Sequence, residues 1–112
     1  MSFWLANFAL WLAGVYFAEN SSKSDEYCPP GPTQFMFLCR VALGNPHVTL
    51  QPRRNLRRPP CVNGHVDFEP NPPCSHERCD SVLAPSQKQD PSACLARFRE
   101  FITYSRDNCY PE

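Results

Sequence analysis

Several features that would indicate common classes of protein are scarce or absent in this sequence. Glycine is rare, with four residues against thirteen prolines, and so many prolines disfavour long regular helices and strands. No charge of one sign predominates, because eleven basic side chains balance eleven acidic ones. A chain without net charge offers no global field to attract a nucleic acid or a membrane surface. Its 112 residues leave room for one domain with a modest core.

No apolar run is long enough to cross a membrane as a helix, which requires about 20 residues. The most apolar stretch, residues 1–13, contains Asn7 and leads into Gly14. It has no Lys or Arg, so it lacks the positively charged start of a secretory signal peptide. We expect residues 1–13 to be an apolar N-terminal segment that packs in the core as a helix or strand, and we expect no membrane partner.

Seven cysteines suggest a disulfide framework, but their number is odd and no secretory signal peptide precedes them. Free thiols are typical of reducing compartments. We therefore expect the protein in the nucleus or the cytoplasm, with Cys39 packed as a buried thiol in an apolar run. The seven are Cys28, Cys39, Cys61, Cys74, Cys79, Cys94 and Cys109.

The most informative stretch is residues 14–27, GVYFAENSSKSDEY. Its apolar part is typical of a strand that ends at Phe17, and the polar residues after it can cap a short helix that begins near Ser21. In that helix, expected over about residues 21–28, Ser24 and Tyr27 share a face. A flat ring that carries an amide group can stack on Tyr27, and such stacking contributes about 0.5–1.5 kcal/mol beyond burial. Ser24 can hydrogen-bond the amide group of the same ring. From these residues alone, a purely structural turn remains the simpler interpretation.

A second informative stretch is residues 98–105, which predicts a strand. Alternation places Glu100 on one face with Phe98, Ile102 and Tyr104. A carboxylate among such neighbours forms an ion pair, shifts its pKa or binds a ligand. The alternative to a functional role is a structural ion pair with an arginine such as Arg97.

The region between these stretches is irregular in character. Residues 28–32 contain three prolines and predict a loop, residues 35–43 predict a buried strand, and residues 45–80 read as a Pro/Arg/Cys-rich insertion. An arginine cluster in the insertion can contact phosphates or direct nuclear import, but a solvated face is the simpler interpretation, so nucleic acid is not an expected partner. The cluster is Arg53, Arg54, Arg57 and Arg58.

Cysteines and histidines in the same insertion are numerous enough to bind zinc. Their spacing, C-x3-H-x8-C-x-H-x2-C, matches no finger or ribbon pattern, and we predict no metal site. A small zinc-stabilised interaction protein built on residues 61–79 is the alternative that this pattern leaves open. The residues are Cys61, His65, Cys74, His76 and Cys79.

Residues 14–27 resemble the nicotinamide-pocket segment of the poly(ADP-ribose) polymerase catalytic domain, G-[IV]-Y-F-A followed by S-K-S-x-x-Y. The segments LCRVALG at 38–44, EFITY at 100–104 and YPE at 110–112 follow in the order of that family. The first segment is most similar to the tankyrase branch. The resemblance implies an α+β fold: a partial ADP-ribosyltransferase fold over residues 14–112, mainly antiparallel sheet with a short helix after the first strand.

The resemblance also implies an activity and a set of site residues. The activity is NAD-dependent protein ADP-ribosylation, adding one unit or a chain of units and releasing nicotinamide, with NAD as substrate and a protein as acceptor. Glu100 matches the catalytic glutamate, and Tyr16 would orient the nicotinamide ribose. Ser24 and Tyr27 would hold nicotinamide, while Lys23 would face the acceptor or a phosphate.

Some features of the family are missing. The histidine-glycine pair expected upstream of Gly14 is absent, and the zinc loop that tankyrases carry before the strand at 35–43 is reduced to Cys28. Asp80 replaces a histidine before a Ser-Val pair that the family places in a loop at the mouth of the active site. The first residues suggest an alternative start or an incomplete record, and the chain stops before the last core strand of the family. The alternative function is therefore an inactive module that binds NAD, nicotinamide or a protein, including its own copies through open sheet edges.

Overall fold

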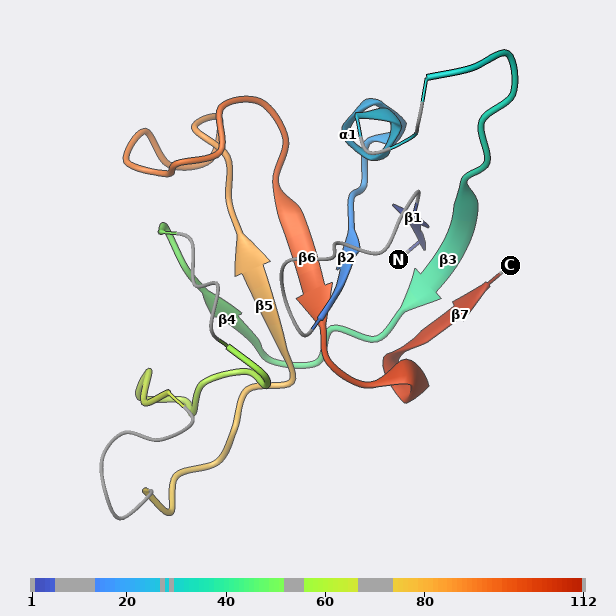
Figure 1. Ribbon diagram of the computed structural model, residues 1–112. Helices are drawn as coiled ribbons and strands as arrows, with labels where there is room; N and C mark the ends of the chain where they lie inside the picture. Colours follow the sequence, from blue (N-terminus) through green and yellow to red (C-terminus); the bar gives the residue numbers. More distant parts are fainter. Residues whose placement is uncertain are drawn as a thin grey trace.

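The fold is a small α+β arrangement in which strands predominate (Figure 1), as the sequence predicted. The computed structural model describes residues 2–5, 14–26, 28, 30–51, 56–66 and 74–111. In chain order the elements are β1 (Ser2–Leu5), β2 (Val15–Phe17), α1 (Ser21–Asp25), β3 (Phe37–Val41), β4 (Pro46–Val48), β5 (Ser81–Ala84), β6 (Glu100–Thr103), a 3-10 helix (Arg106–Asn108) and β7 (Cys109–Pro111).

The strands of the described residues form two sheets. One has the order β1-β3-β7 and the other the order β2-β6-β5-β4. Every pair is antiparallel except β4 and β5, which run parallel. Parallel strands need a long connection, and the chain between residues 49 and 80 provides it. The expectation of a mainly antiparallel sheet is confirmed.

The core lies between the two sheets. Phe17 of β2 pairs in register with Phe101 of β6, so their side chains leave the same face of the four-stranded sheet. Both are buried together with Cys39 and Val41 of β3, the central strand of the other sheet. The opposite face of β6 is also buried, since Ile102 and its partner Val82 of β5 lie on it together with Glu100.

Two glycines are required by close packing. A Cβ at Gly14 would lie 2.6 Å from Ile102 Cγ2 and 3.1 Å from the Thr103 carbonyl oxygen. Only glycine, which has no Cβ, therefore allows the chain before β2 to approach β6 this closely. Gly44 has a φ of +56°, and a Cβ there would lie 2.6 Å from Asp80 Cγ. Asp80 instead accepts a 2.7 Å hydrogen bond from the Asn45 N–H and ties the turn before β4 to the start of β5.

The predicted helix and strands differ from the structure mainly at their ends. The Asn20 side chain accepts a 2.9 Å hydrogen bond from the Ser22 N–H and begins α1 at Ser21, as expected, but the helix ends at Asp25 rather than near residue 28. The strand predicted as buried over 35–43 is shorter, Phe37–Val41, and only Cys39 and Val41 of it are buried, because the other face of the strand is exposed.

The insertion predicted over residues 45–80 contains a strand, β4, that sequence reasoning missed. The Ser-Val pair expected in a loop is also part of a strand, β5, and that expectation is wrong. Ser81 is fully buried, and its hydroxyl donates a 2.8 Å hydrogen bond to the Leu43 carbonyl. Within residues 1–13, Ser2–Leu5 form a strand beside β3, and residues 6–13 lie outside the described part. No helix among the described residues is long and apolar enough to cross a membrane.

Candidate functional site

The candidate site lies on the face of β2 and β6 that points away from the core. Tyr16 pairs in register with Ile102, so both side chains leave the face opposite to Phe17 and Phe101. Glu100 lies two residues before Ile102 and shares its face. Tyr16 and Glu100 are thus diagonal neighbours, whose Cα atoms are typically about 7–8 Å apart and within reach of long side chains. The structure places on one face the two residues to which sequence analysis assigned catalysis.

The environment of Tyr16 keeps its hydroxyl protonated. Burial raises the pKa of Tyr16 well above its ordinary value, and the charges of Tyr104 and Glu100 raise the pKa further. Tyr16 is therefore a neutral hydrogen-bond donor beside a carboxylate at any physiological pH. Tyr104 directly follows β6 and is near enough to Tyr16 to contribute to this rise in pKa.

Glu100 is buried at the start of β6 and lies close to a lysine of α1. Lys23 Nζ is 3.6 Å from Glu100 Oε1, and the two side chains are only 15% and 10% exposed. The same ammonium is 3.5 Å from Glu26 Oε2, which is more exposed. Sequence analysis had considered an arginine such as Arg97 for this ion pair. The Arg97 guanidinium instead lies 5.0 Å from the centroid of the Phe98 ring.

The remaining predicted site residues come from α1 and the segment after it. Ser24 is the fourth residue of the five-residue helix and is buried at 4% exposure. Tyr27 lies outside the described residues, so the predicted grip on an amide-bearing ring stays a prediction. Lys23 was expected to face an acceptor or a phosphate, and here its ammonium lies against the carboxylates of Glu100 and Glu26.

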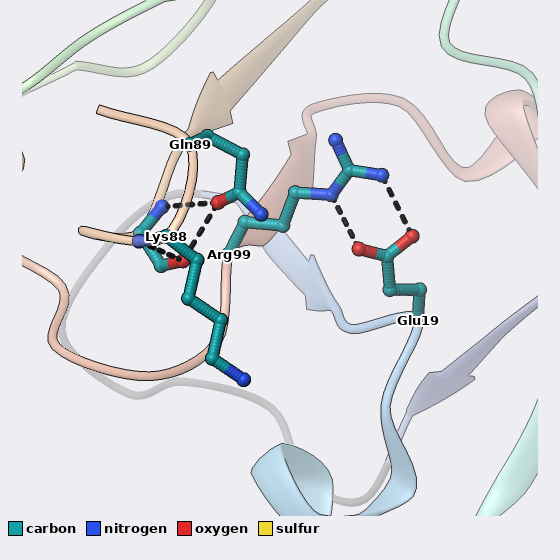
Figure 2. Close-up of polar contacts among 5 residues, drawn as sticks. Glu19, Lys88, Gln89 and Arg99 are labelled. Atoms are coloured by element: carbon teal, nitrogen blue, oxygen red, sulfur yellow. Dashed lines mark hydrogen bonds and ion pairs between the residues drawn. The ribbon is translucent and has the colours of Figure 1, made fainter.

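A second ion pair fastens β2 to β6 and was not anticipated from the sequence. Arg99 Nε donates to Glu19 Oε1 and Arg99 Nη2 donates to Glu19 Oε2 at 2.8 Å, a two-pronged contact shown in Figure 2. These hydrogen bonds lower the pKa of Glu19 and raise the pKa of Arg99. Because Glu19 follows β2 and Arg99 precedes Glu100, the pair holds together the strands that carry Tyr16 and Glu100. Glu19 and Arg99 are 80 positions apart, and no local pattern in the sequence links them. The only signal was that each lies next to a strand predicted to carry a site residue.

Figure 2 also shows the turn that follows β5. The Ser86 hydroxyl and N–H donate to Gln89 Oε1 at 2.6 and 2.9 Å, and the Lys88 N–H donates to the Ser86 hydroxyl at 3.3 Å. The Lys88 ammonium lies 5.6 Å from the centroid of the Phe98 ring. This turn therefore brings a second cation to the ring that Arg97 also approaches.

A cluster of metal-ligand residues lies elsewhere in the fold, in segments 56–66 and 74–80, which extend from the end of the four-stranded sheet opposite α1 (Figure 1). Burial raises the pKa of the Cys61 thiol, but hydrogen bonds from neighbouring groups, the His65 N–H foremost, bring that pKa below its ordinary value. Burial raises the pKa of Cys79, which is not part of the cluster. The cluster consists of Cys61, His65, Cys74 and His76, whose ligand atoms all lie within 4.8 Å of one another.

The class of the protein, the ADP-ribosyltransferases that use NAD, follows from its family rather than from the geometry alone. Comparison of the sequence with protein-family models gives a match to the poly(ADP-ribose) polymerase catalytic domain over residues 10–112. The match spans nearly the whole chain and includes residues 45–77, which the segments recognised in the sequence did not cover. The chain belongs to the poly(ADP-ribose) polymerase catalytic-domain family.

Proposed function

We propose that this chain transfers ADP-ribose from NAD to a protein acceptor, with Tyr16 and Glu100 at the reacting centre. The observation that carries the proposal is their position on one face of adjacent strands, away from the core and under Lys23 of α1. The similarity of residues 14–27 to tankyrases supports a tankyrase-like form of the reaction. The product is either a single ADP-ribose or a chain.

The reaction breaks the bond between nicotinamide and the ribose carbon to which it is attached. The bonding electrons leave with nicotinamide and neutralise its ring charge, while positive charge develops on the ribose, as it does in glycoside hydrolysis. An oxygen or nitrogen of the acceptor attacks the same carbon and loses its proton. The protein therefore has to position the partners and stabilise charge rather than form a covalent intermediate.

Glu100 suits the role of the charge-stabilising group. Its carboxylate would accept a hydrogen bond from the ribose 2′-hydroxyl, offset the positive charge on the ribose and polarise the attacking acceptor. Tyr16, held neutral by its environment, would pack against the ribose next to nicotinamide and donate a hydrogen bond. Ser24 and Tyr27 would hold the nicotinamide amide and ring.

Lys23 has a role of its own in this proposal. Its ammonium, 3.6 Å from Glu100 Oε1, would hold the Glu100 carboxylate in place. When NAD enters, the same ammonium is close enough to the reacting centre to contact a phosphate or the acceptor. Lys23 would then hold Glu100 in place before NAD binds and contact the substrate afterwards.

The test is transfer of labelled ADP-ribose from NAD to protein, with two matched variants. Both Glu100 and Glu26 contact Lys23, but only Glu100 lies in the sheet. We expect Glu100→Gln to reduce transfer by at least about 100-fold, the loss typical of a charge-stabilising group, and Glu26→Gln to retain transfer within about threefold. Equal transfer by the Glu100→Gln variant and the wild type would contradict the proposal. NAD binding without transfer in the wild type, weakened by Tyr27→Ala, would favour the inactive binding module.

A further inference from the structure

The strongest unassigned feature of the molecule is the cluster formed by Cys61, His65, Cys74 and His76, hereafter the Cys/His cluster. Two thiols and two imidazoles converge with their ligand atoms within 4.8 Å of one another. Cys61 is fully buried, His65 and Cys74 are half-buried, and His76 is exposed. The cluster is far from the α1 end of the sheet where Lys23 meets Glu100 (Figure 1), so the proposed transfer reaction does not use it.

The distances within the Cys/His cluster are those that one metal ion would impose. Cys61 Sγ lies 3.4 Å from His65 Nδ1 and 3.9 Å from His76 Nδ1. A tetrahedral Zn²⁺ with Zn–S of about 2.3 Å and Zn–N of about 2.0–2.1 Å sets its sulfur and nitrogen ligands about 3.5 Å apart. The observed values lie on either side of that separation. For these two pairs a shift of a few tenths of an ångström is enough to reach a common ion, and all four ligand atoms already lie within 4.8 Å of one another.

The backbone holds the two ligand-bearing segments together without help from a metal. Cys61 forms an antiparallel bridge with Arg78, and the Val62 N–H donates a 2.8 Å hydrogen bond to the Glu77 carbonyl. Within the first segment, Gly64 takes a φ of +86° and turns the chain back toward Cys61. The His65 N–H then donates a 3.2 Å hydrogen bond to Cys61 Sγ. An N–H aimed at the sulfur favours the thiolate, the form that binds metals.

The partner of the second ring nitrogen of His76 also suits a metal ligand. The Asn63 side-chain nitrogen Nδ2 lies 3.1 Å from His76 Nε2. Metal-binding histidines commonly hydrogen-bond their other nitrogen to an oxygen that fixes the ring orientation. The Asn63 amide presents either its NH2 or its oxygen after a half-turn, so it can accept the proton that Nε2 carries when Nδ1 binds an ion.

We propose that Cys61, His65, Cys74 and His76 bind one structural zinc ion. Two sulfurs and two imidazole nitrogens in a tetrahedron suit Zn²⁺ better than the oxygen-preferring Mg²⁺ or Ca²⁺. Four protein ligands leave no open position, which indicates a structural rather than a catalytic ion. The ion would fasten segment 56–66 to segment 74–80 next to the start of β5. This place in the chain differs from the loop before β3, where tankyrases carry their zinc loop and this chain has only Cys28.

The experiment measures zinc content and affinity of the full 112-residue chain. After dialysis, elemental analysis should find one zinc per chain, and Co²⁺ added to the metal-free chain should give tetrahedral d–d absorption together with a thiolate charge-transfer band. His76→Ala removes an exposed ligand that the fold does not need, and it should weaken binding at least tenfold. Cys94→Ser, at an exposed thiol outside the cluster, should leave affinity unchanged.

A further variant tests which thiols bind the ion. Cys79 is close in sequence but not part of the cluster, so Cys79→Ser should retain one zinc, whereas Cys74→Ser should lose it. Less than one zinc ion for every ten chains of wild type, a Co²⁺ spectrum without a thiolate band, or unchanged affinity in the His76→Ala variant would each overturn the proposal. Glu100→Gln should bind zinc as the wild type does, which separates this proposal from the proposed transfer reaction.

Discussion

At the scale of single residues, the site depends on a tyrosine that cannot easily ionise and a glutamate held against a lysine. Tyr16 donates rather than accepts, because burial and nearby negative charge oppose the loss of its proton. Glu100 is buried to 8% exposure and lies against the Lys23 ammonium. A hydroxyl donor and a carboxylate acceptor that lie on one face can orient a ribose, which carries hydroxyl groups that both donate and accept.

The raised pKa of Tyr16 predicts a particular loss of stability at alkaline pH. An unfolded tyrosine loses its proton near about pH 10, whereas the folded protein retains it to higher pH, so the free energy of unfolding falls as the pH rises above about 10. Because Tyr16 is only half-buried, we expect this contribution to be at most about 1 kcal/mol at pH 11. Urea unfolding at pH 8 and 11 measures it.

Tyr110 is the control for this prediction, because its side chain is 72% exposed. Tyr16→Phe should remove part of the alkaline loss, and Tyr110→Phe should not. An alkaline loss that is identical in the wild type and the Tyr16→Phe variant would show that the pKa of Tyr16 is not raised by folding.

At the scale of elements, the close approach of β2 to β6 puts Tyr16 opposite Ile102. Gly14 makes the approach possible, and the Glu19–Arg99 ion pair fastens the other end of β2. Sequence analysis identified both strands and the start of α1, because their patterns are local. It missed the Glu19–Arg99 pair and the contact between Lys23 and Glu100, because both depend on segments that meet only in the fold.

Substitution at Gly14 tests this arrangement of strands. Gly14→Ala places a methyl group against Ile102 and the Thr103 carbonyl, and since the backbone oxygen cannot move aside, we expect a loss of about 1–3 kcal/mol in the free energy of unfolding. Gly31→Ala is the matched control, because nothing lies within 4 Å of a Cβ there. Thermal or urea unfolding compares the two. Equal stabilities of the two variants would contradict the close packing of β2 on β6.

At the scale of the whole molecule, two sheets share one core and leave the site and the Cys/His cluster at opposite ends (Figure 1). The α+β class and the antiparallel character could be predicted from strand patterns and family resemblance. β4 and β5 could not, since β4 begins at a proline and only pairing with β5 makes it a strand. The convergence of Cys61 with Cys74 could not be predicted either, because a spacing with twelve residues between the two cysteines fits no known pattern.

The outer strands of the two sheets are the places where another copy of the chain could pair. In the described part of the chain, β1 and β7 are the outer strands of one sheet and β2 and β4 those of the other. Outer strands present unpaired backbone groups to other chains. Self-association through these edges stays a prediction from the sequence.

The central claim is that the face carrying Tyr16 and Glu100 transfers ADP-ribose from NAD. The most direct measurement is the intact mass of the wild-type chain after incubation with NAD and a protein acceptor, with NAD binding followed in the same sample. We predict that the chain or the acceptor gains mass in whole ADP-ribose units and that free nicotinamide appears in equal amount. Saturable binding of NAD with unchanged masses of both proteins would contradict the claim.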